Sequence, residues 1–180
     1  MSKTAVIYQS TYGTTRTYAE QIAQELGANL IERKKAKISE LVGYDTIIFG
    51  GGIYVGQIAG SGLIRKNYEK LKEKHLVVFS VGFTPHARID ILDKVRLSSF
   101  EADQLMNINF FHFHGGVDYK NLNLFHKFLI STKRLLISIQ PESKLTTDNK
   151  RFLKLYGKRI ESSYESPNAL ITYVKGISSI

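Results

Sequence analysis

The sequence predicts an α/β fold: a doubly wound, five-stranded parallel sheet with helices on both faces. Apolar runs of strand length alternate along the chain with segments whose apolar residues recur at helical spacing. The segments that connect the strands are too long for hairpins, which favours parallel strands. The third expected strand, residues 45–52, reads as an apolar run, as is typical of a strand covered on both faces.

The expected strands are rich in β-branched and aromatic residues and cover residues 3–9, 28–34, 45–52, 75–82 and 106–116. A first helix is expected to end at Gly27, where a glycine can adopt the left-handed conformation of a C-cap. Its apolar or small stripe consists of Tyr18, Ala19, Ile22, Ala23 and Leu26. Further helical segments are expected over residues 38–44, 62–74, 87–100 and 147–163.

The segment 147–163 is expected to be the last helix of the fold. Its N-cap is expected at Thr147 or Asp148, because these side chains accept hydrogen bonds from free N–H groups. Its apolar face would consist of Phe152, Leu153, Tyr156 and Ile160. The whole chain, residues 1–180, is expected to form a single domain, with an insertion at about 117–146 and a tail, 164–180, to which no element is assigned.

Composition limits the chemistry. The chain has no cysteine, which excludes disulfides, thiolate catalysis and cysteine-bound metal sites. The net charge of +9 favours anionic partners, but no run of five like charges occurs, so nucleic-acid binding is not expected. No export signal and no apolar window of about 18 residues is evident, so the expected location is cytoplasmic, with peripheral contact at the inner face of the membrane as a further expectation.

The turn after the first strand, "QSTYGTT", carries an unusual number of hydroxyl groups around one glycine. A helix N-terminus presents free N–H groups and a partial positive charge, and hydroxyls add short donors. We therefore expect this turn to hold a phosphate without any basic side chain. An ordinary N-cap by Ser10 or Thr14 is the simpler alternative.

Other phosphate-binding loops do not fit this turn. A Walker loop requires a lysine, and a dinucleotide fingerprint requires more glycines than Gly13 alone. A phospho-acceptor receiver domain would carry aspartates after the first and third strands, where this chain has Gln9-Ser10 and Phe49-Gly50.

The stretch "IYQSTYGTTRTYAEQIA" resembles the flavodoxin signature, and the resemblance extends over about residues 3–163. It implies a flavodoxin-like fold and FMN as the cofactor, with the FMN phosphate held by Ser10, Thr11, Tyr12, Gly13, Thr14 and Thr15. It also implies that two further loops contact the flavin ring. These loops supply Gly52, Ile53, Tyr54, Val55 and Gly56 after the third strand, and Ser80, Val81, Gly82 and Phe83 after the fourth.

Tyr54 is expected to stack on the isoalloxazine, because a flat aromatic ring stands among glycines there. A flexible loop with a chance tyrosine is the alternative, and Phe83 is equally consistent with a core position. His112 and His114 share one face of the last strand and are expected to be a hydrogen-bonded polar pair, since a zinc site needs three or four ligands. His86 is expected to be a polar loop residue, so no metal site and no catalytic residue is predicted.

The run "FFHFHGGVDYKNLNLFHKFLI" resembles the flavodoxin-related, quinone-dependent protoporphyrinogen oxidases of bacteria. The resemblance implies an oxidoreductase that passes electrons to a membrane quinone. The loop "GGGIYVG" lacks the arginine of that family, and His126-Lys127 replaces its Asp-Arg pair. An electron-transfer flavodoxin that acts as a soluble carrier is the alternative, and a redox partner protein is then expected. A regulatory module without cofactor is disfavoured by the intact first loop.

The inserted segment carries an amphipathic pattern. Its apolar stripe consists of Leu122, Phe125, Phe128, Leu129, Leu136 and Ile139, and its basic residues are Lys127, Lys133 and Arg134. We expect a helix over 121–139 that contacts an anionic membrane surface or a similarly acidic partner. A helix packed on the edge of the sheet is the alternative.

Overall fold

The computed structural model describes residues 3–84, 88–115, 117–118, 124–156, 159–160 and 166–178. The chain divides into two compact units. The sheet unit comprises residues 1–115 and 163–180, and the helical unit comprises residues 116–162.

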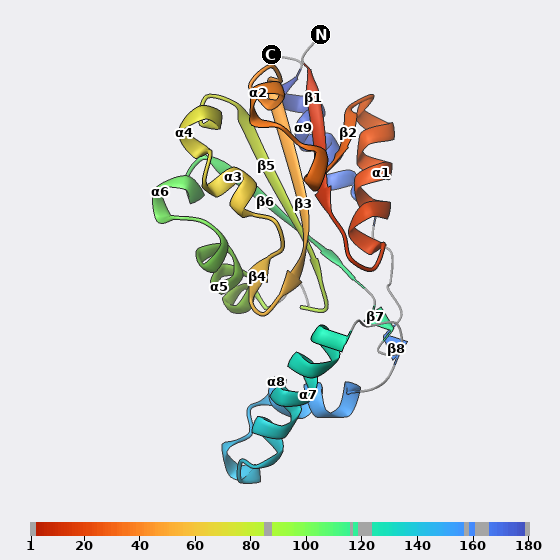
Figure 1. Cartoon of the computed structure of the whole chain (residues 1–180), viewed down its shortest axis with the longest axis vertical. Helices are drawn as coiled ribbons and strands as arrows, with labels where there is room; N and C mark the ends of the chain where they lie inside the picture. The colour runs from red at the N-terminus through yellow and green to blue at the C-terminus, as the bar shows by residue number, and fades with distance from the viewer. Residues whose placement is uncertain are drawn as a thin grey trace. The chain divides into compact units, whose positions relative to one another are not determined.

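A parallel sheet forms the centre of the sheet unit (Figure 1). Its strands lie in the order β2-β1-β3-β5-β6 and are all parallel to their neighbours. Their bounds are β1 Thr4–Gln9, β2 Asn29–Glu32, β3 Thr46–Tyr54, β5 His75–Gly82 and β6 Ile108–His114. The predicted fold class is confirmed. The short strand β4, Gln57–Ile58, adds an antiparallel pairing to β3 that the sequence reading did not include.

The connecting segments are mostly helical. They comprise α1 Thr14–Leu26, η1 Arg33–Lys35, α2 Ile38–Leu41, α3 Gly62–Arg65, α4 Tyr68–Leu71, α5 Ile89–Ser99, α6 Ala102–Leu105 and α9 Asn168–Ile177. The prediction of a single helix over residues 62–74 is wrong, because α3 and α4 are separate helices. The chain leaves the helical conformation at Asn67, whose side-chain amide donates to the Leu63 carbonyl at 2.8 Å. Asparagine competes in this way for backbone groups that would otherwise continue the helix.

Each face of the sheet has its own core (Figure 1). Ala5, Ile7 and Phe49 point to one face and pack with side chains of α3, α4 and α5. Val6 and Phe79 point to the other face and pack with α1 and α9. This alternation along β1 follows from the two-residue period of a strand, and burial on both faces explains why the central strands are apolar throughout.

The last helix of the sheet unit is α9, Asn168–Ile177, and the prediction of segment 147–163 for this position is wrong. Leu170, Ile171 and Val174 lie on one side of α9 and are buried against the core that α1 also covers. These three residues recur at helical spacing within the tail to which no element had been assigned.

The helical unit contains α7, Leu124–Ser138, and α8, Thr147–Leu155, with a short helix η3, Glu142–Lys144, between them. The strands β7, Val117–Asp118, and β8, Arg159–Ile160, pair antiparallel. The N-cap of α8 is Thr146, one residue before the predicted position, and its hydroxyl accepts from the Asn149 N–H at 3.2 Å.

The apolar face predicted for segment 147–163 packs within the helical unit. The guanidinium of Arg134 lies 4.5 Å from the centre of the Tyr156 ring, and the Lys133 ammonium lies 4.8 Å from that of Phe152. A cation is attracted to the face of an aromatic ring, so these contacts join α7 to α8 and to Tyr156, which follows α8. Within the described ranges, no helix has the length and apolar character needed to cross a membrane.

Candidate functional site

The carboxyl ends of β1, β3 and β5 lie side by side at one edge of the sheet. The chain leaves β1 for β2 on one side and later continues with β3 on the other side, so the strand order reverses between β1 and β3. Ligands of open α/β sheets bind at the carboxyl edge where such a reversal occurs. The three loops chosen from the sequence therefore meet at one place.

The first loop connects β1 to α1 and leaves the start of the helix open. Gly13 is the N-cap residue, with a φ of 96°, and no side chain caps the first turn. The Gly13 N–H donates to Ser10 Oγ at 3.1 Å, which closes the turn, and Thr17 N–H makes the first helical bond to the Gly13 carbonyl. Capping by Ser10 or Thr14, the simpler alternative, is therefore not what the structure has.

The donors around this helix N-terminus are neutral. Thr14 is half-buried at the first helical position, Thr15 is buried, and the first turn carries no acidic residue. A dianionic phosphate needs several N–H and O–H donors, and a carboxylate in the first turn would repel it. The residues Ser10–Thr15 thus have the donor set that a phosphate monoester requires.

The second loop is a tight hairpin between β3 and β4. The sequence reading ended this strand at Gly52, but β3 continues through Ile53 to Tyr54 because both residues pair with β4. Val55 and Gly56 form the turn, with φ values of 49° and 78°. Two successive residues with positive φ are typical of the turn that suits a two-residue hairpin, and valine is rarely found there.

The glycines of β3 make room for the protein's own atoms. A Cβ at Gly50 would stand 2.0 Å from Phe79 Cζ, and one at Gly51 would stand 2.4 Å from the carbonyl oxygen of Ala59. A Cβ at Gly52 would stand 2.8 Å from the Tyr54 ring. Other atoms of the protein therefore approach the β3 backbone closely at these glycines, and they belong to β5, to Ala59 and to the hairpin itself.

Tyr54 joins the first two loops. Its ring centre lies 6.4 Å from that of Tyr12, and its hydroxyl is hydrogen-bonded to Thr11. Burial raises the pKa of the Tyr54 phenol because it disfavours the phenolate, and the hydrogen bond with Thr11 acts in the opposite direction. The aromatic ring is thus held beside the turn Ser10–Thr15 in its neutral form.

The third group of residues belongs mainly to a strand. Ser80, Val81 and Gly82 are the last residues of β5, and Phe83 follows with 39% of its surface exposed. Phe83 is therefore not a buried core residue. Its exposed ring is available to a ligand at this edge.

His112 is the functional candidate whose partners the sequence did not reveal. Its Nδ1 lies 2.9 Å from Ser80 Oγ, and its Nε2 lies 2.8 Å from the Thr84 carbonyl oxygen. A carbonyl only accepts, so Nε2 carries a proton, and in the neutral ring Nδ1 accepts from the Ser80 hydroxyl. His112 thereby fixes the segment that contains Phe83. His86 lies outside the described residues, and no group of three potential metal ligands occurs among the described ones.

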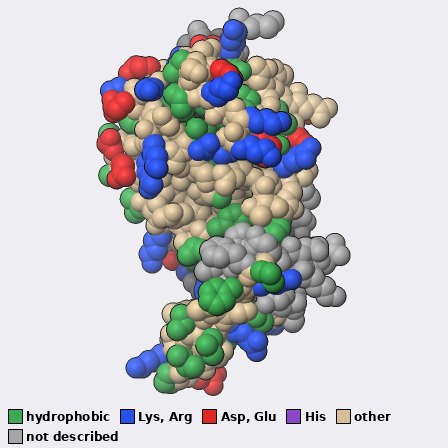
Figure 2. All heavy atoms as spheres, in the orientation of Figure 1, with side chains coloured by type: hydrophobic (Ala, Val, Ile, Leu, Met, Phe, Trp, Pro, Cys, Tyr) green, Lys and Arg blue, Asp and Glu red, His purple; other side chains and the backbone are tan. Residues whose placement is uncertain are grey.

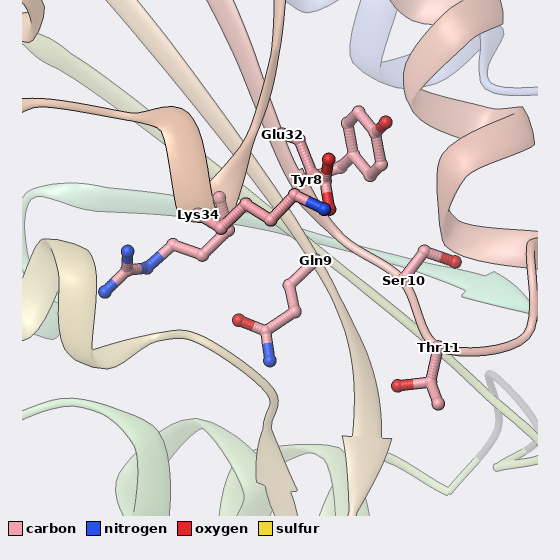
Figure 3. A pocket seen from close by; sticks show the side chains of 7 residues that line it. Tyr8, Gln9, Ser10, Thr11, Glu32 and Lys34 are labelled. Atoms are coloured by element: carbon pink, nitrogen blue, oxygen red, sulfur yellow. The ribbon is translucent and has the colours of Figure 1, made fainter.

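A cavity of about 340 Å³ opens beside the first loop (Figure 3). Its lining consists of Tyr8, Gln9, Ser10, Thr11, Glu32, Arg33 and Lys34. Ser10 and Thr11 were expected from the sequence, whereas the residues that follow β2 were not. The basic run after the second strand was the available signal, because the ends of neighbouring parallel strands lie together.

Comparison with known proteins agrees with this arrangement. Residues 5–136 match the sequence model of a family described as the flavodoxin domain. The chain belongs to the flavodoxin family. A search of curated proteins gave no match.

Several solved flavodoxin structures resemble the chain at low identity. Flavodoxin 2 from Bacillus cereus is 21% identical, with a TM-score of 0.48, and the match covers 62% of this chain and 84% of that one. A WrbA-like flavodoxin from Agrobacterium tumefaciens is 20% identical, with a TM-score of 0.45 and coverage of 87% and 93%. A flavodoxin from the domain Archaea is 20% identical, with a TM-score of 0.43 and coverage of 63% and 83%. The family assignment rests on the sequence match.

Membership of the flavodoxin family implies FMN as the cofactor. The donor set of this flavodoxin domain fits that group, since the free N-terminus of α1 and the hydroxyls of Thr14 and Thr15 suit the phosphate. The half-buried ring of Tyr54 at the end of β3 and the exposed ring of Phe83 after β5 suit a flat ring system.

Proposed function

We propose that this flavodoxin is an FMN-dependent oxidoreductase of the type represented by the quinone-dependent protoporphyrinogen oxidases. The observation that carries the flavin assignment is the uncapped start of α1 among hydroxyl side chains. Such a helix N-terminus leaves N–H groups without acceptors unless an anion or water supplies them.

Each loop has a distinct role in this proposal. Residues Ser10–Thr15 bind the phosphate through N–H groups and hydroxyls. The hairpin Gly52–Gly56 presents Tyr54 to one face of the isoalloxazine. Residues Ser80–Phe83 offer backbone groups to its polar edge and an aromatic ring nearby. When bound, FMN supplies hydride or single-electron transfer, and the chain orients the ring and keeps water from the covered face.

Charge favours a partner that is anionic. The net charge is +9, and Lys and Arg side chains are prominent on the face of the sheet unit in Figure 2. A carrier flavodoxin that docks on basic partners would be expected to be acidic, because complementary charge steers the encounter. The basic charge thus disfavours the soluble electron carrier, which is the second candidate function.

The helical unit supports contact with a membrane. Leu124, Phe128, Leu135, Leu136 and Ile139 are each more than half exposed and, apart from Ile139 just beyond its end, belong to α7. Positions 128, 135, 136 and 139 share one face at helical spacing, so α7 presents an apolar stripe to solvent. An apolar stripe with basic neighbours is typical of helices that lie in a membrane interface.

Two of the three basic residues predicted beside the apolar stripe contact aromatic rings of the helical unit. Lys133 lies over the Phe152 ring in α8 and Arg134 over the Tyr156 ring just beyond it, so both side chains are held within the helical unit. The proposal for the membrane therefore depends more on the apolar stripe than on these two charges. The residues Leu122, Phe125 and Leu129 of the predicted stripe lie outside the described residues or have side chains that are not described.

The test begins with purified protein and FMN. A flavin absorption spectrum that shifts on binding, with one FMN per chain, is expected. A quinone-dependent porphyrinogen oxidation assay with the FMN-loaded protein then separates the two candidates. Turnover with quinone is expected for the oxidase, whereas bound FMN that exchanges electrons only with a redox protein would identify the carrier. Failure to bind FMN would overturn the proposal.

A further inference from the structure

We propose that the cavity beside the first loop binds a second phosphate group, separate from the FMN phosphate. The cavity lies at the carboxyl ends of β1 and β2, on the far side of β1 from β3. The second site rests on the proposed function only in that FMN is taken to occupy the neighbouring turn. Phosphate binding to the cavity is therefore measured both with and without the flavin.

Arg33 has a buried donor group that lacks an acceptor in the described part of the chain. Its Nε is buried and has no hydrogen-bond partner among the described residues, although Arg33 lines the cavity. A buried N–H without an acceptor is destabilising, so such groups are rare in folded proteins. An acceptor oxygen inside the cavity would satisfy it, and guanidinium groups recognise phosphate oxygens with paired N–H donors.

The charge of the cavity also favours an anion. Lys34 points toward Glu32 in Figure 3, and its ammonium lies 2.9 Å from the Glu32 carboxylate. That pair leaves the charge of Arg33 without a counter-ion in the cavity lining. A guest with at least one negative charge would therefore be stabilised there.

The remaining lining side chains are donors. Gln9 supplies an amide, and Ser10 and Thr11 supply hydroxyls. Gly60 permits this position of Gln9, because a Cβ at Gly60 would stand 2.4 Å from Gln9 Oε1. Together with Arg33 these groups offer more donors than the two oxygens of a carboxylate accept, whereas a phosphate has three or four oxygens.

Two sources supply a phosphate at this position. One is the phosphate ester of a separate substrate that binds beside the flavin. The other is the outer phosphate of a flavin dinucleotide, whose inner phosphate would occupy the turn Ser10–Thr15. Ser10 and Thr11 belong to both places, so a bridging diphosphate would contact the two sites at once.

The test is a titration of inorganic phosphate into FMN-saturated protein in phosphate-free buffer. Binding is followed by calorimetry and by the NMR signal of the Arg33 Nε–H. The variant Arg33→Gln is expected to weaken binding about tenfold or more, the scale of one charge-assisted contact. Arg65→Gln is the matched control, since Arg65 lies on α3 outside the cavity and its loss lowers the net charge equally. It is expected to change binding by less than about twofold.

A parallel titration of FAD and FMN into the flavin-free protein distinguishes the sources. Phosphate binding that requires Arg33 identifies a separate phosphate ester. Tighter binding of FAD than of FMN, lost in Arg33→Gln, identifies the linked phosphate. If neither dependence on Arg33 is found, the proposal is overturned. If FMN itself does not bind, phosphate is titrated into the flavin-free parent, Arg33→Gln and Thr14→Val/Thr15→Val proteins, which tests the cavity apart from the flavin assignment.

Discussion

Ser80 Oγ lies 2.9 Å from Nδ1 of His112, so side chains as well as backbones join the ends of β5 and β6. The other ring nitrogen of His112 donates to the Thr84 carbonyl. One imidazole therefore holds the start of the β5–α5 loop against the sheet, next to the exposed Phe83. Rigid support of this kind allows a loop to present binding groups in one geometry.

This relationship predicts energetic coupling between Ser80 and His112. Ser80→Ala and His112→Leu are each expected to lower the free energy of unfolding by about 1–3 kcal/mol, because a buried partner loses its hydrogen bond. The double variant should cost less than the sum, with a coupling of about 0.5–1.5 kcal/mol in denaturant unfolding. His75→Leu, at the exposed start of β5, is the control. Strictly additive effects would contradict the coupling.

The proposed role of the turn Ser10–Thr15 predicts a loss of FMN affinity when hydroxyls are removed. Thr14→Val/Thr15→Val keeps the side-chain shape and removes two donors, so FMN binding should weaken by about 1–3 kcal/mol, or roughly five- to 150-fold. Affinity is measured by quenching of flavin fluorescence. Thr17→Val is the control, because the Thr17 hydroxyl already donates to the Gly13 carbonyl. Equal affinity in the parent and the double variant would show that the turn does not hold the phosphate.

Tyr54 is predicted to quench the fluorescence of bound FMN by stacking on the isoalloxazine. In Tyr54→Ala, part of the fluorescence should return at full flavin occupancy, since the contact with the ring is lost. Phe83→Ala serves as the comparison, as Phe83 is an exposed aromatic residue at the same edge of the sheet. Recovery in Phe83→Ala but not in Tyr54→Ala would transfer the stacking role to Phe83.

Gly50 is predicted to be intolerant of any side chain. A Cβ there would overlap the Phe79 ring, whereas a Cβ at Gly62 meets nothing within 4 Å. Gly50→Ala should therefore lower the free energy of unfolding by about 1–3 kcal/mol or more through overpacking. Gly62→Ala, in helix α3, should leave it unchanged or raise it by up to about 1 kcal/mol. Thermal or denaturant unfolding measures both, and equal stability of the two variants would contradict the packing of β3 on β5.

The exposed stripe of α7 is predicted to bind anionic membranes. Phe128→Ser/Leu136→Ser should reduce co-sedimentation with anionic vesicles about tenfold or more, because two apolar side chains no longer enter the interface. Leu97→Ser, on the exposed side of α5, is the control for apolar surface in general. Pelleting of the parent should prefer anionic over neutral vesicles and decline with salt. Negligible pelleting of the parent in every condition would remove the membrane from the proposal.

Local sequence patterns were sufficient to predict the parallel sheet and the hydroxyl-rich first loop. Both depend on local patterns: apolar runs of strand length, a helical stripe after Thr14, and hydroxyls where the two elements meet. Such patterns persist because the periods of strand and helix fix which side chains can be buried.

The extent of β3 was decided by tertiary pairing. Ile53 and Tyr54 extend the strand only because Gln57 and Ile58 lie beside them, and Ile58 N–H is in turn bonded to the distant Ser99 hydroxyl. No pattern confined to residues 50–56 carries that information. The bond between Ser80 and His112 is of the same kind, as it joins residues that are 32 positions apart.

Long-range packing also determines which helix covers the sheet next to α1. Residues 147–155 and 168–177 both have amphipathic helical patterns, and either could cover the sheet on local grounds. Leu170, Ile171 and Val174 are the ones buried against α1, while Phe152 and Tyr156 of the first segment contact Lys133 and Arg134. An amphipathic pattern predicts that one face of a helix is buried. The surface against which that face packs depends on the three-dimensional structure.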